Sequence, residues 1–367
     1  MRLLLVTQDF PPETGGIQSF IGGLSLQMPA LCEDFAVIAP GGEREMHHDK
    51  VLPFDVYRIP IHSSWLTLGL WPKLGKILKQ RQSTHLLYAQ WFPATNRLGL
   101  PKGLRTGVFS YGRELKNHPL SDLGLAFAGP TFRKIDVHMP ISRHTASLMP
   151  KSLDHSTFKI IYPGVELERF SPPTPEQTQA LRQRLGLGDA PVVSCLTRLV
   201  ERKGVDTLLR SFALLRERMP EARLVIGGKG PDGERLRQIH SELDLGDRAI
   251  FAGRIEDEEL SAFYALGVFS LLSRETGRDV EGFGMVLTEA QACGACVVAA
   301  QSGGMPEAVG PGAGHIVPPD DPAAAADAFA QLLGNAEQRR NMGEAGKRFA
   351  ATLDWRSRAE AVVAALR

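Results

Sequence analysis

Short apolar runs alternate along the chain with longer segments in which apolar residues recur every three or four positions. The short runs are typical of buried parallel strands, and the longer segments are typical of helices that cover one face of a sheet. In the first part of the chain this pattern predicts helices between several strands, for example at 17–28 and 142–149. The predicted strands are 3–7, 35–39, 56–59, 86–90, 106–110, 137–140 and 159–161.

The same alternation begins again at residue 192 and continues to the end of the chain. The predicted strands are 192–197, 223–227, 249–252, 268–272 and 296–300. The predicted helices are 205–218, 233–243, 256–265, 285–293 and 355–366, and no strand follows the last one. Because strands alternate with helices in both parts, we expect an α/β protein with parallel sheets.

A proline-rich segment separates the two parts. Phe170 is followed by Ser-Pro-Pro-Thr-Pro-Glu, and three prolines in four residues interrupt both helices and sheets. At 367 residues the chain also exceeds the roughly 250–300 residues at which single cores stop growing. We therefore expect two Rossmann-like, doubly wound parallel-sheet domains that face a cleft, at residues 1–170 and 171–353.

The overall composition is that of an ordinary soluble globular protein, with 43% hydrophobic and 23% charged residues. No apolar run reaches the ~18–20 residues of a membrane span, and the first six residues are too short for a signal peptide. These features predict a cytoplasmic protein. The four cysteines include one C-x-x-C, Cys293 and Cys296, but no second pair completes a zinc site, which favours buried, reduced thiols.

The net charge of +1 hides a local asymmetry. Residues 58–116 hold ten basic residues and one acid, which favours an anionic partner such as a lipid headgroup or a phosphorylated acceptor. No nucleic-acid motif accompanies this charge. Within the segment, a predicted helix has Leu70, Leu74, Ile77 and Leu78 on one face and lysines elsewhere. This helix either contacts an anionic membrane surface or packs on its own sheet with the lysines in water.

The stretch from Glu281 to Glu289 reads EGFGMVLTE and precedes a predicted helix. Gly282 and Gly284 let the backbone approach a ligand closely, and free N–H groups at a helix start can hold a diphosphate. The Glu289 carboxylate can accept hydrogen bonds from two vicinal ribose hydroxyls. Two other pairs of glutamates have the same spacing without glycines between them, so the glycines and the helix start distinguish this pair.

Two further motifs carry charges or glycines that suit a phosphate. Gly15 and Gly16 lie after the first strand and directly before a helix, where backbone N–H groups can point at a phosphate. Arg198 and Lys203 follow the first strand of the second part and can together neutralise a diphosphate leaving group. We interpret Arg202, beside Lys203, as a solvated neighbour.

Two glycine loops follow strands in the second part. Gly228 and Gly230 belong to a GGKGP loop that can face a nucleotide, and Gly303 and Gly304 can present amides to a sugar or phosphate. No Asp-x-Asp occurs in the chain, and metal-chelating diphosphate enzymes usually need paired carboxylates. We therefore expect no metal and no other cofactor.

Together, these residues resemble the family-4 (GT4) retaining glycosyltransferases of the GT-B class, over essentially the whole chain. The motifs that carry the resemblance are the glycine pair 15–16, Tyr162-Pro-Gly-Val, the pair Arg198 and Lys203, Gly228-Lys-Gly-Pro, Glu281-Gly-Phe-Gly with Glu289, and Gly303-Gly-x-Pro-Glu. Their order and spacing are specific together, although no single motif is.

The resemblance implies that the second domain binds a nucleotide-diphosphate sugar, with a UDP- or GDP-sugar as the expected donor. Arg198 and Lys203 would hold the diphosphate, Glu289 the ribose and Glu281 the donor sugar. The amides of Gly284, Met285 and Val286 would lie at the phosphate and sugar, and Gly16 would approach the diphosphate across the cleft. The first domain would bind the acceptor, and the C-terminal helix 354–367 would cross back onto it.

One position departs from the family pattern. Family members usually carry His-Gly-x-Glu with the histidine at the reacting centre, but here the segment is Ser110-Tyr-Gly-Arg-Glu, so Tyr111 takes the histidine position. A phenol with a pKa near ~10 donates a hydrogen bond readily but is a poor base. In the front-face chemistry that the resemblance implies, the leaving diphosphate helps to take the acceptor proton. Tyr111 would then position a sugar hydroxyl. His118 could compensate, although a surface loop histidine is the simpler interpretation.

The predicted function is thus metal-independent retaining transfer of a sugar from a nucleotide donor to a hydroxyl acceptor. The acceptor would be a sugar or a lipid-linked glycan, and the protein would associate peripherally with the inner face of the membrane. Two alternatives stay open. One is a sugar-nucleotide epimerase of the same fold. The other is a non-catalytic nucleotide-sugar-binding protein, which Tyr111 motivates.

Overall fold

The computed structural model describes residues 1–60, 66–94, 100–112, 133–277 and 279–367. Its contacts divide the chain into two compact units. The first unit contains Met1–Gly164 and Trp355–Arg367, and the second contains Val165–Asp354. The second unit thus begins before the proline-rich segment at which we placed the boundary. Pro175 in that segment is the first residue of a helix, a position where its missing N–H costs nothing.

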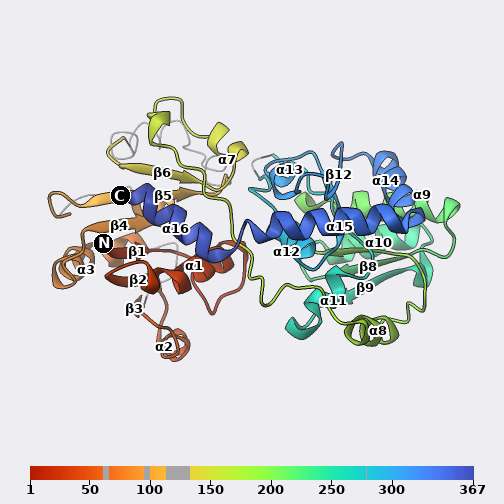
Figure 1. Cartoon of the computed structure of the whole chain (residues 1–367), viewed down its shortest axis with the longest axis horizontal. Coiled ribbons are helices and arrows are strands. Elements are labelled where there is room, and N and C mark those ends of the chain that lie inside the picture. The colour runs from red at the N-terminus through yellow and green to blue at the C-terminus, as the bar shows by residue number, and fades with distance from the viewer. Residues whose placement is uncertain (61–65, 95–99, 113–132, 278) are drawn as a thin grey trace. The chain divides into compact units, whose positions relative to one another are not determined.

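The first unit is built on a six-stranded parallel sheet in the order β3-β2-β1-β4-β5-β6 (Figure 1). The strands are β1 Arg2–Val6, β2 Asp34–Pro40, β3 Asp55–Ile59, β4 His85–Tyr88, β5 Arg105–Ser110 and β6 Val137–Pro140. The helices are α1 Gly16–Gln27, α2 Glu43–Asp49, α3 Leu66–Gln80, α4 Trp91–Ala94, α7 Arg143–Ser147 and α16 Trp355–Leu366. The α/β fold with a parallel sheet is confirmed for this unit.

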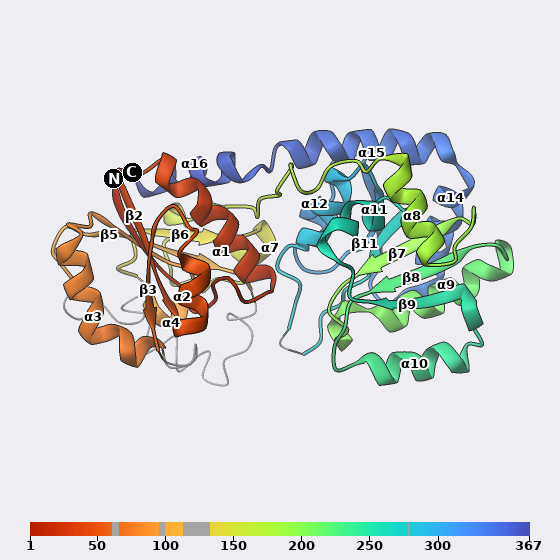
Figure 2. The ribbon, with the colours of Figure 1, turned by 90° about the horizontal axis from the view of Figure 1, so that it is seen from below.

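The second unit repeats this topology, with the sheet order β12-β11-β10-β7-β8-β9 and all neighbours parallel. The strands are β7 Val192–Leu196, β8 Arg223–Gly227, β9 Ala249–Gly253, β10 Val268–Leu271, β11 Cys296–Ala300 and β12 Gly314–Val317. The helices are α8 Pro175–Arg184, α9 Val205–Arg218, α10 Gly233–Glu242, α11 Leu260–Tyr264, α12 Met285–Ala292, α13 Met305–Ala308, α14 Pro322–Gly334 and α15 Ala336–Ala351. Figure 2 shows α9 and α10 on one face of this sheet and α8, α11 and α12 on the other.

Each sheet has a point where the strand order reverses, between β1 and β4 in the first unit and between β7 and β10 in the second. In doubly wound sheets, ligands bind outside the carboxyl ends of the strands at this switch point, because the connections leave there in opposite directions. In the second unit the loops after β7 and β10 therefore mark the place to look for a site.

The predicted strand at 159–161 is wrong as a regular strand. Phe158 forms an isolated bridge with His138, and the backbone N–H groups of Lys159 and Ile161 donate to carbonyls of β6. The segment follows the end of β6 without forming a full ladder. β12, α2, α8 and α15 were not predicted, whereas α9 and α16 have the predicted bounds.

The helix in the basic segment packs on its own sheet. Leu70, Leu74, Ile77 and Leu78 of α3 are buried in the core of the first unit, while Lys73, Lys76 and Lys79 are exposed. The apolar residues at positions 70, 74, 77 and 78 of α3 are therefore used inside the protein, while these three lysines face solvent. Within the described ranges, no helix is both long and apolar enough to cross a membrane.

All four cysteines are free, and Cys195, Cys293 and Cys296 are buried, which agrees with the interpretation as reduced thiols. Burial raises the pKa of Cys293 to about 12 and that of Cys296 to about 11. Both thiols are therefore protonated near neutral pH.

The C-terminal helix α16 packs against α1 and β5 in the first unit, and Figure 1 shows it beside α1. Its first residue, Trp355, lies edge-on to Phe20 with ring centroids 5.9 Å apart. A Cβ on Gly23 of α1 would lie only 2.4 Å from the Trp355 ring. The absence of a side chain at Gly23 thus lets the indole lie against the α1 backbone.

Replacing Gly23 by alanine should destabilise the first unit by about 1–3 kcal/mol, because the rigid indole must move. This loss should exceed the gain of up to ~1 kcal/mol in helix propensity. Gly334→Ala is the matched control, since a Cβ there would meet no atom within 4 Å. Differential scanning calorimetry should show a lower unfolding temperature for Gly23→Ala only. Equal shifts for the two variants would contradict this account of the packing.

Candidate functional site

Two loops meet at the switch point of the second sheet. The loop after β7 contains a single 3-10 turn, Glu201–Lys203, before α9 begins. The loop after β10 runs from Leu272 to Gly284, where α12 begins. The Arg274 N–H donates to the Arg202 carbonyl at 2.8 Å, which joins the two loops through their backbones.

A cluster of four charged side chains joins the same loops. Arg202 Nη1 donates to Glu281 Oε2 at 2.7 Å, and the Lys203 ammonium pairs with that same oxygen. Arg202 Nε lies 3.1 Å from Asp279 Oδ2. Glu281 and Lys203 are 14% and 12% exposed, so this pair is largely withdrawn from water. Two cations and two carboxylates thus balance each other in this four-residue cluster.

The ionisation of Glu281 follows from these neighbours. Burial raises the pKa of Glu281, but the opposing charges of Lys203 and Arg202 outweigh burial and bring the pKa to about 2. The carboxyl group is therefore ionised throughout the neutral range and accepts hydrogen bonds only. An ionised carboxylate at this point can accept hydrogen bonds from sugar hydroxyls.

The interpretation of Arg202 as a solvated neighbour is wrong. Its side chain is 23% exposed and pairs with both carboxylates of the loop after β10. Arg198, which we grouped with Lys203, is exposed at the end of β7. It forms no ion pair with a residue in the described part of the chain. Its guanidinium is thus available to an anion from solvent.

The start of α12 presents backbone donors beside this cluster. Gly284 precedes the helix with φ of 94°, a left-handed conformation that favours glycine. Met285 and Val286 begin the helix, so their N–H groups have no carbonyl one turn back to pair with. Together with Arg198 and Lys203, these N–H groups can hold a diphosphate.

Glu289 lies one turn into α12 and has a partner that the sequence analysis did not identify. The Tyr264 hydroxyl, from α11, donates to Glu289 Oε2 at 2.5 Å, and Tyr264 is 1% exposed. Burial raises the pKa of Glu289, and the hydrogen bond from Tyr264 opposes that rise. Tyr264 therefore both orients the carboxylate and helps it to stay ionised.

The glycines of the two other loops meet backbone rather than open space. A Cβ would lie 1.9 Å from the Thr197 carbonyl oxygen at Gly228 and 2.1 Å from the Leu199 carbonyl oxygen at Gly230. Gly303 and Gly304 have the same relation to the carbonyls of residues 281 and 282, at 2.1 and 2.0 Å. Close packing between loops thus accounts for glycine at these four positions, whatever they bind.

In the first unit, Gly15 and Gly16 are exposed at the start of α1, as their place after β1 predicts. Their loop is held by Asp9, whose carboxylate accepts from Gln18 and Gln90 at 2.9 Å each. Tyr111 follows β5 and is 8% exposed, with its ring edge-on to Phe20 at 5.8 Å. His118 lies outside the described residues.

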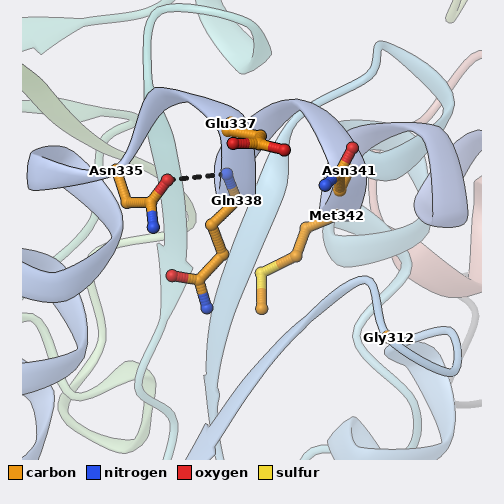
Figure 3. Close-up of a pocket in the computed structure, with 6 residues that line it drawn as sticks. All are labelled: Gly312, Asn335, Glu337, Gln338, Asn341 and Met342. Carbon is orange, nitrogen blue, oxygen red and sulfur yellow. Dashed lines mark hydrogen bonds between the residues drawn. The ribbon is translucent and has the colours of Figure 1, made fainter.

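Two cavities of similar size are lined by described residues of the second unit. One of about 420 Å³ lies at the carboxyl ends of β8 and β9, between Lys229, Arg237 and Phe251. The other, of about 390 Å³, is lined by α15, its N-cap Asn335 and Gly312, and Figure 3 shows Gln338 and Met342 extending from the same side of that helix. Gly312 lies two residues before β12, so this second cavity lies near the amino end of an edge strand, whereas the charged cluster lies at the carboxyl ends of the central strands β7 and β10. Only the first cavity adjoins the switch-point loops.

Three residues of this arrangement were not predicted from the sequence as parts of it: Arg202, Asp279 and Tyr264. Asp279 precedes Glu281 by two residues, a spacing that could have suggested two acids beside two adjacent cations. Tyr264 carries no such signal, because a tyrosine in a short apolar helix is most often a core residue. In the described part of the chain, no group of three or more His, Cys, Asp or Glu side chains is arranged to hold a metal.

A known protein family matches part of this chain, and known sequences are similar to it over most of its length. Residues 177–349 match the family described as "Glycosyl transferases group 1". The "GDP-mannose-dependent alpha-(1-6)-phosphatidylinositol monomannoside mannosyltransferase" of Mycolicibacterium smegmatis is 36% identical, over 97% of this chain and 96% of the relative. The Mycobacterium tuberculosis protein of the same name is 34% identical, over 97% and 94%. A "GDP-mannose-dependent monoacylated alpha-(1-6)-phosphatidylinositol monomannoside mannosyltransferase" of Corynebacterium glutamicum is 33% identical, over 94% and 92%.

Solved structures share the fold at lower identity. The structure of Anabaena Alr3699/HepE in complex with UDP has a TM-score of 0.80 and 19% identity, over 99% of this chain and 98% of that one. A glycosyltransferase from Rickettsia africae has a TM-score of 0.80 and 17% identity, over 98% and 96%. These similarities support the two-domain α/β architecture.

Replacing Glu281 by glutamine should lower the free energy of unfolding by roughly 2–4 kcal/mol near neutral pH, because two cations would face a neutral amide. The pKa of Glu281 is lowered from 4.5 to about 2. The stabilisation from its charge is therefore complete above about pH 4.5 and is lost as the pH falls toward about 2. Urea unfolding at a series of pH values should show the difference from wild type shrinking across that window. Glu221→Gln, at an exposed position, serves as the control. If the difference in unfolding free energy between Glu281→Gln and wild type does not change with pH, the stabilising role of the Glu281 charge is refuted.

Proposed function

The chain belongs to the group 1 glycosyl transferases, with the GT-B fold, and we propose that it transfers mannose from GDP-mannose to a lipid-linked inositol glycan. As a member of this family, the protein is a hexosyltransferase that uses a nucleotide sugar. One observation carries the finer proposal. Relatives that are 33–36% identical over at least 94% of this chain are named for GDP-mannose and for phosphatidylinositol monomannoside.

The charged cluster supports the donor half of the proposal. Arg198, Lys203 and the start of α12 would receive the diphosphate of GDP-mannose, since cations and helix N–H groups stabilise the charge that develops on a leaving diphosphate. Glu289 would accept the ribose hydroxyls, and Glu281 would accept hydroxyls of the mannose. The cavity between Lys229, Arg237 and Phe251 would receive the guanosine end.

The acceptor half rests on the relatives and on charge. A phosphatidylinositol mannoside carries an anionic headgroup, and the exposed lysines of α3 supply a positive field in the first unit. We propose peripheral attachment to the inner membrane face through this field. The buried apolar face of α3 takes no part in it.

We further propose that transfer retains the anomeric configuration and needs no metal. Cationic side chains and helix amides would neutralise the leaving diphosphate, which would itself help to accept the proton of the attacking hydroxyl. Tyr111 would donate a hydrogen bond and position a sugar hydroxyl rather than act as a base. The relatives named above are transferases, so they lend no support to an epimerase or to a binding protein without turnover.

Among GDP, UDP, ADP and TDP, GDP should stabilise the protein most. At a hundred times its dissociation constant the gain should be about 2.7 kcal/mol, readily visible as a thermal shift. EDTA should leave this shift unchanged. Radiolabelled GDP-mannose should then yield mannosylated lipid with phosphatidylinositol monomannoside but no product without an acceptor. A preference for UDP would overturn the donor assignment, and loss of the shift or of transfer in EDTA would overturn metal independence.

Removing the Tyr264 hydroxyl tests the ribose contact. Tyr264→Phe should weaken GDP binding about 5- to 30-fold, because Glu289 loses the hydrogen bond that orients it. The loss should grow as the pH is lowered. The pKa of Glu289 is already raised by burial, and it rises further without the hydrogen bond, so protonation removes the acceptor at a higher pH.

Tyr57→Phe is the matched control, since its hydroxyl contacts Arg81 in the first unit. Isothermal titration calorimetry of both variants at several pH values measures the effect. Equal affinities for GDP in the two variants at every pH would refute the ribose role of Glu289.

A further inference from the structure

Arg202 belongs to the charged cluster but has no part in the function proposed above. We propose that Arg202, held by Asp279, is a positioning residue that fixes the Glu281 carboxylate for the donor sugar while Lys203 turns to the donor diphosphate. This inference rests on the proposed function. It gives a role to Arg202 and Asp279, which the proposed donor contacts do not use.

The contacts make Arg202 the centre of the cluster. Its Nη1 reaches Glu281 Oε2 at 2.7 Å and its Nε reaches Asp279 Oδ2 at 3.1 Å. Among the described residues, by contrast, Lys203 pairs with Glu281 and with no other carboxylate. The carboxylates at 279 and 281 are therefore connected through one guanidinium.

Donor binding changes the charge around Lys203. The cluster is balanced by two cations and two carboxylates, and a diphosphate brings about two further negative charges to the site. An ammonium is a compact charge on a flexible stem that can turn from one anion to another. If Lys203 turns to the diphosphate, Glu281 loses one of its two cations at the moment when it must hold the sugar. Arg202 is the cation that stays.

Arginine suits this task better than lysine would. Its guanidinium is planar and presents donors in a fixed fork, so one side chain can bind two carboxylates in a defined geometry. The two carboxylates use different nitrogens, Nε and Nη1, which fixes the plane of the group. Rotation of the Glu281 carboxylate away from the sugar would break its hydrogen bond from Arg202 Nη1.

The backbone of the loop supports the same arrangement. Thr276 and Asp279 exchange backbone hydrogen bonds at 3.0 and 2.9 Å just before Glu281. Two residues before Thr276, Arg274 pairs with Asp206, which is 8% exposed at the start of α9. The backbone of Asp279 is thus held by its own loop. Asp279 can therefore fix the position of the Arg202 side chain.

The experiment compares a nucleotide with its sugar conjugate. Dissociation constants for GDP and GDP-mannose are measured by isothermal titration calorimetry for wild type, Arg202→Lys and Asp279→Asn. Arg202→Lys keeps the charge and removes the fork. It should weaken GDP-mannose about tenfold and GDP less than about twofold, because only the conjugate carries the sugar that Glu281 binds. Asp279→Asn should act in the same direction by about threefold.

Arg218→Lys is the matched control, because Arg218 is 53% exposed and pairs with an exposed aspartate on the surface of the same unit. It should change neither affinity. Thermal unfolding of each variant tests its folding. If Arg202→Lys fails to fold, Asp279→Asn leaves the arginine in place and carries the comparison alone.

Two results would overturn the inference. Equal losses for GDP and GDP-mannose would show that Arg202 contacts the diphosphate itself. Unchanged affinity for both ligands would show that its contact with Glu281 is dispensable. Failure of the proposed function would be seen in the wild type itself, not in the variants. Wild type that binds neither GDP nor GDP-mannose would overturn the donor assignment, and this inference with it.

Discussion

The candidate site depends on one carboxylate oxygen, Glu281 Oε2, which two cations from another loop share. Apart from the Thr276–Asp279 bridge, the described residues of the loop after β10 form no strand and no helix before α12, so no extended ladder of backbone hydrogen bonds sets the course of this loop. Ion pairs do this instead. These ion pairs are strong because the side chains are mostly withdrawn from water. Opposite charges attract each other more strongly in such surroundings than in bulk solvent. The position of α12, and with it Glu289, follows from a loop held in this way.

Close backbone packing makes those ion pairs possible. Gly204 has φ of 65°, and a Cβ there would lie 2.0 Å from the Leu272 carbonyl oxygen, so only glycine lets the loops after β7 and β10 touch. Gly303 brings the loop after β11 against residue 281 by the same means. Three loops thus converge at the switch point because glycines stand where they cross. The charged side chains then lie within reach of one another.

The sequence predicts most of this fold and part of the site. Periodicity found α9 and α16 with their observed bounds, because both helices bury one apolar stripe. It missed α15, whose buried face is made of glycine and alanine and so lacks large apolar residues. Motifs located Glu281, Lys203 and Glu289. They did not reveal that Arg202 pairs with Asp279, since that contact joins loops about 77 residues apart and depends on how each loop turns.

The contrast between Arg198 and Lys203 shows how such a site could neutralise a diphosphate with side chains alone. In the described part of the chain no acid pairs with Arg198, whereas Lys203 is already paired with Glu281. An incoming diphosphate would therefore meet one available cation, the partial positive charge at the start of α12, and one cation that turns to it from Glu281. Lys203 thus links the two ends of the donor, because the carboxylate that it leaves is the one that we assign to the sugar. A nucleotide without a sugar would draw Lys203 away and gain nothing from Glu281, so the same ion pair can favour the complete donor over the free nucleotide.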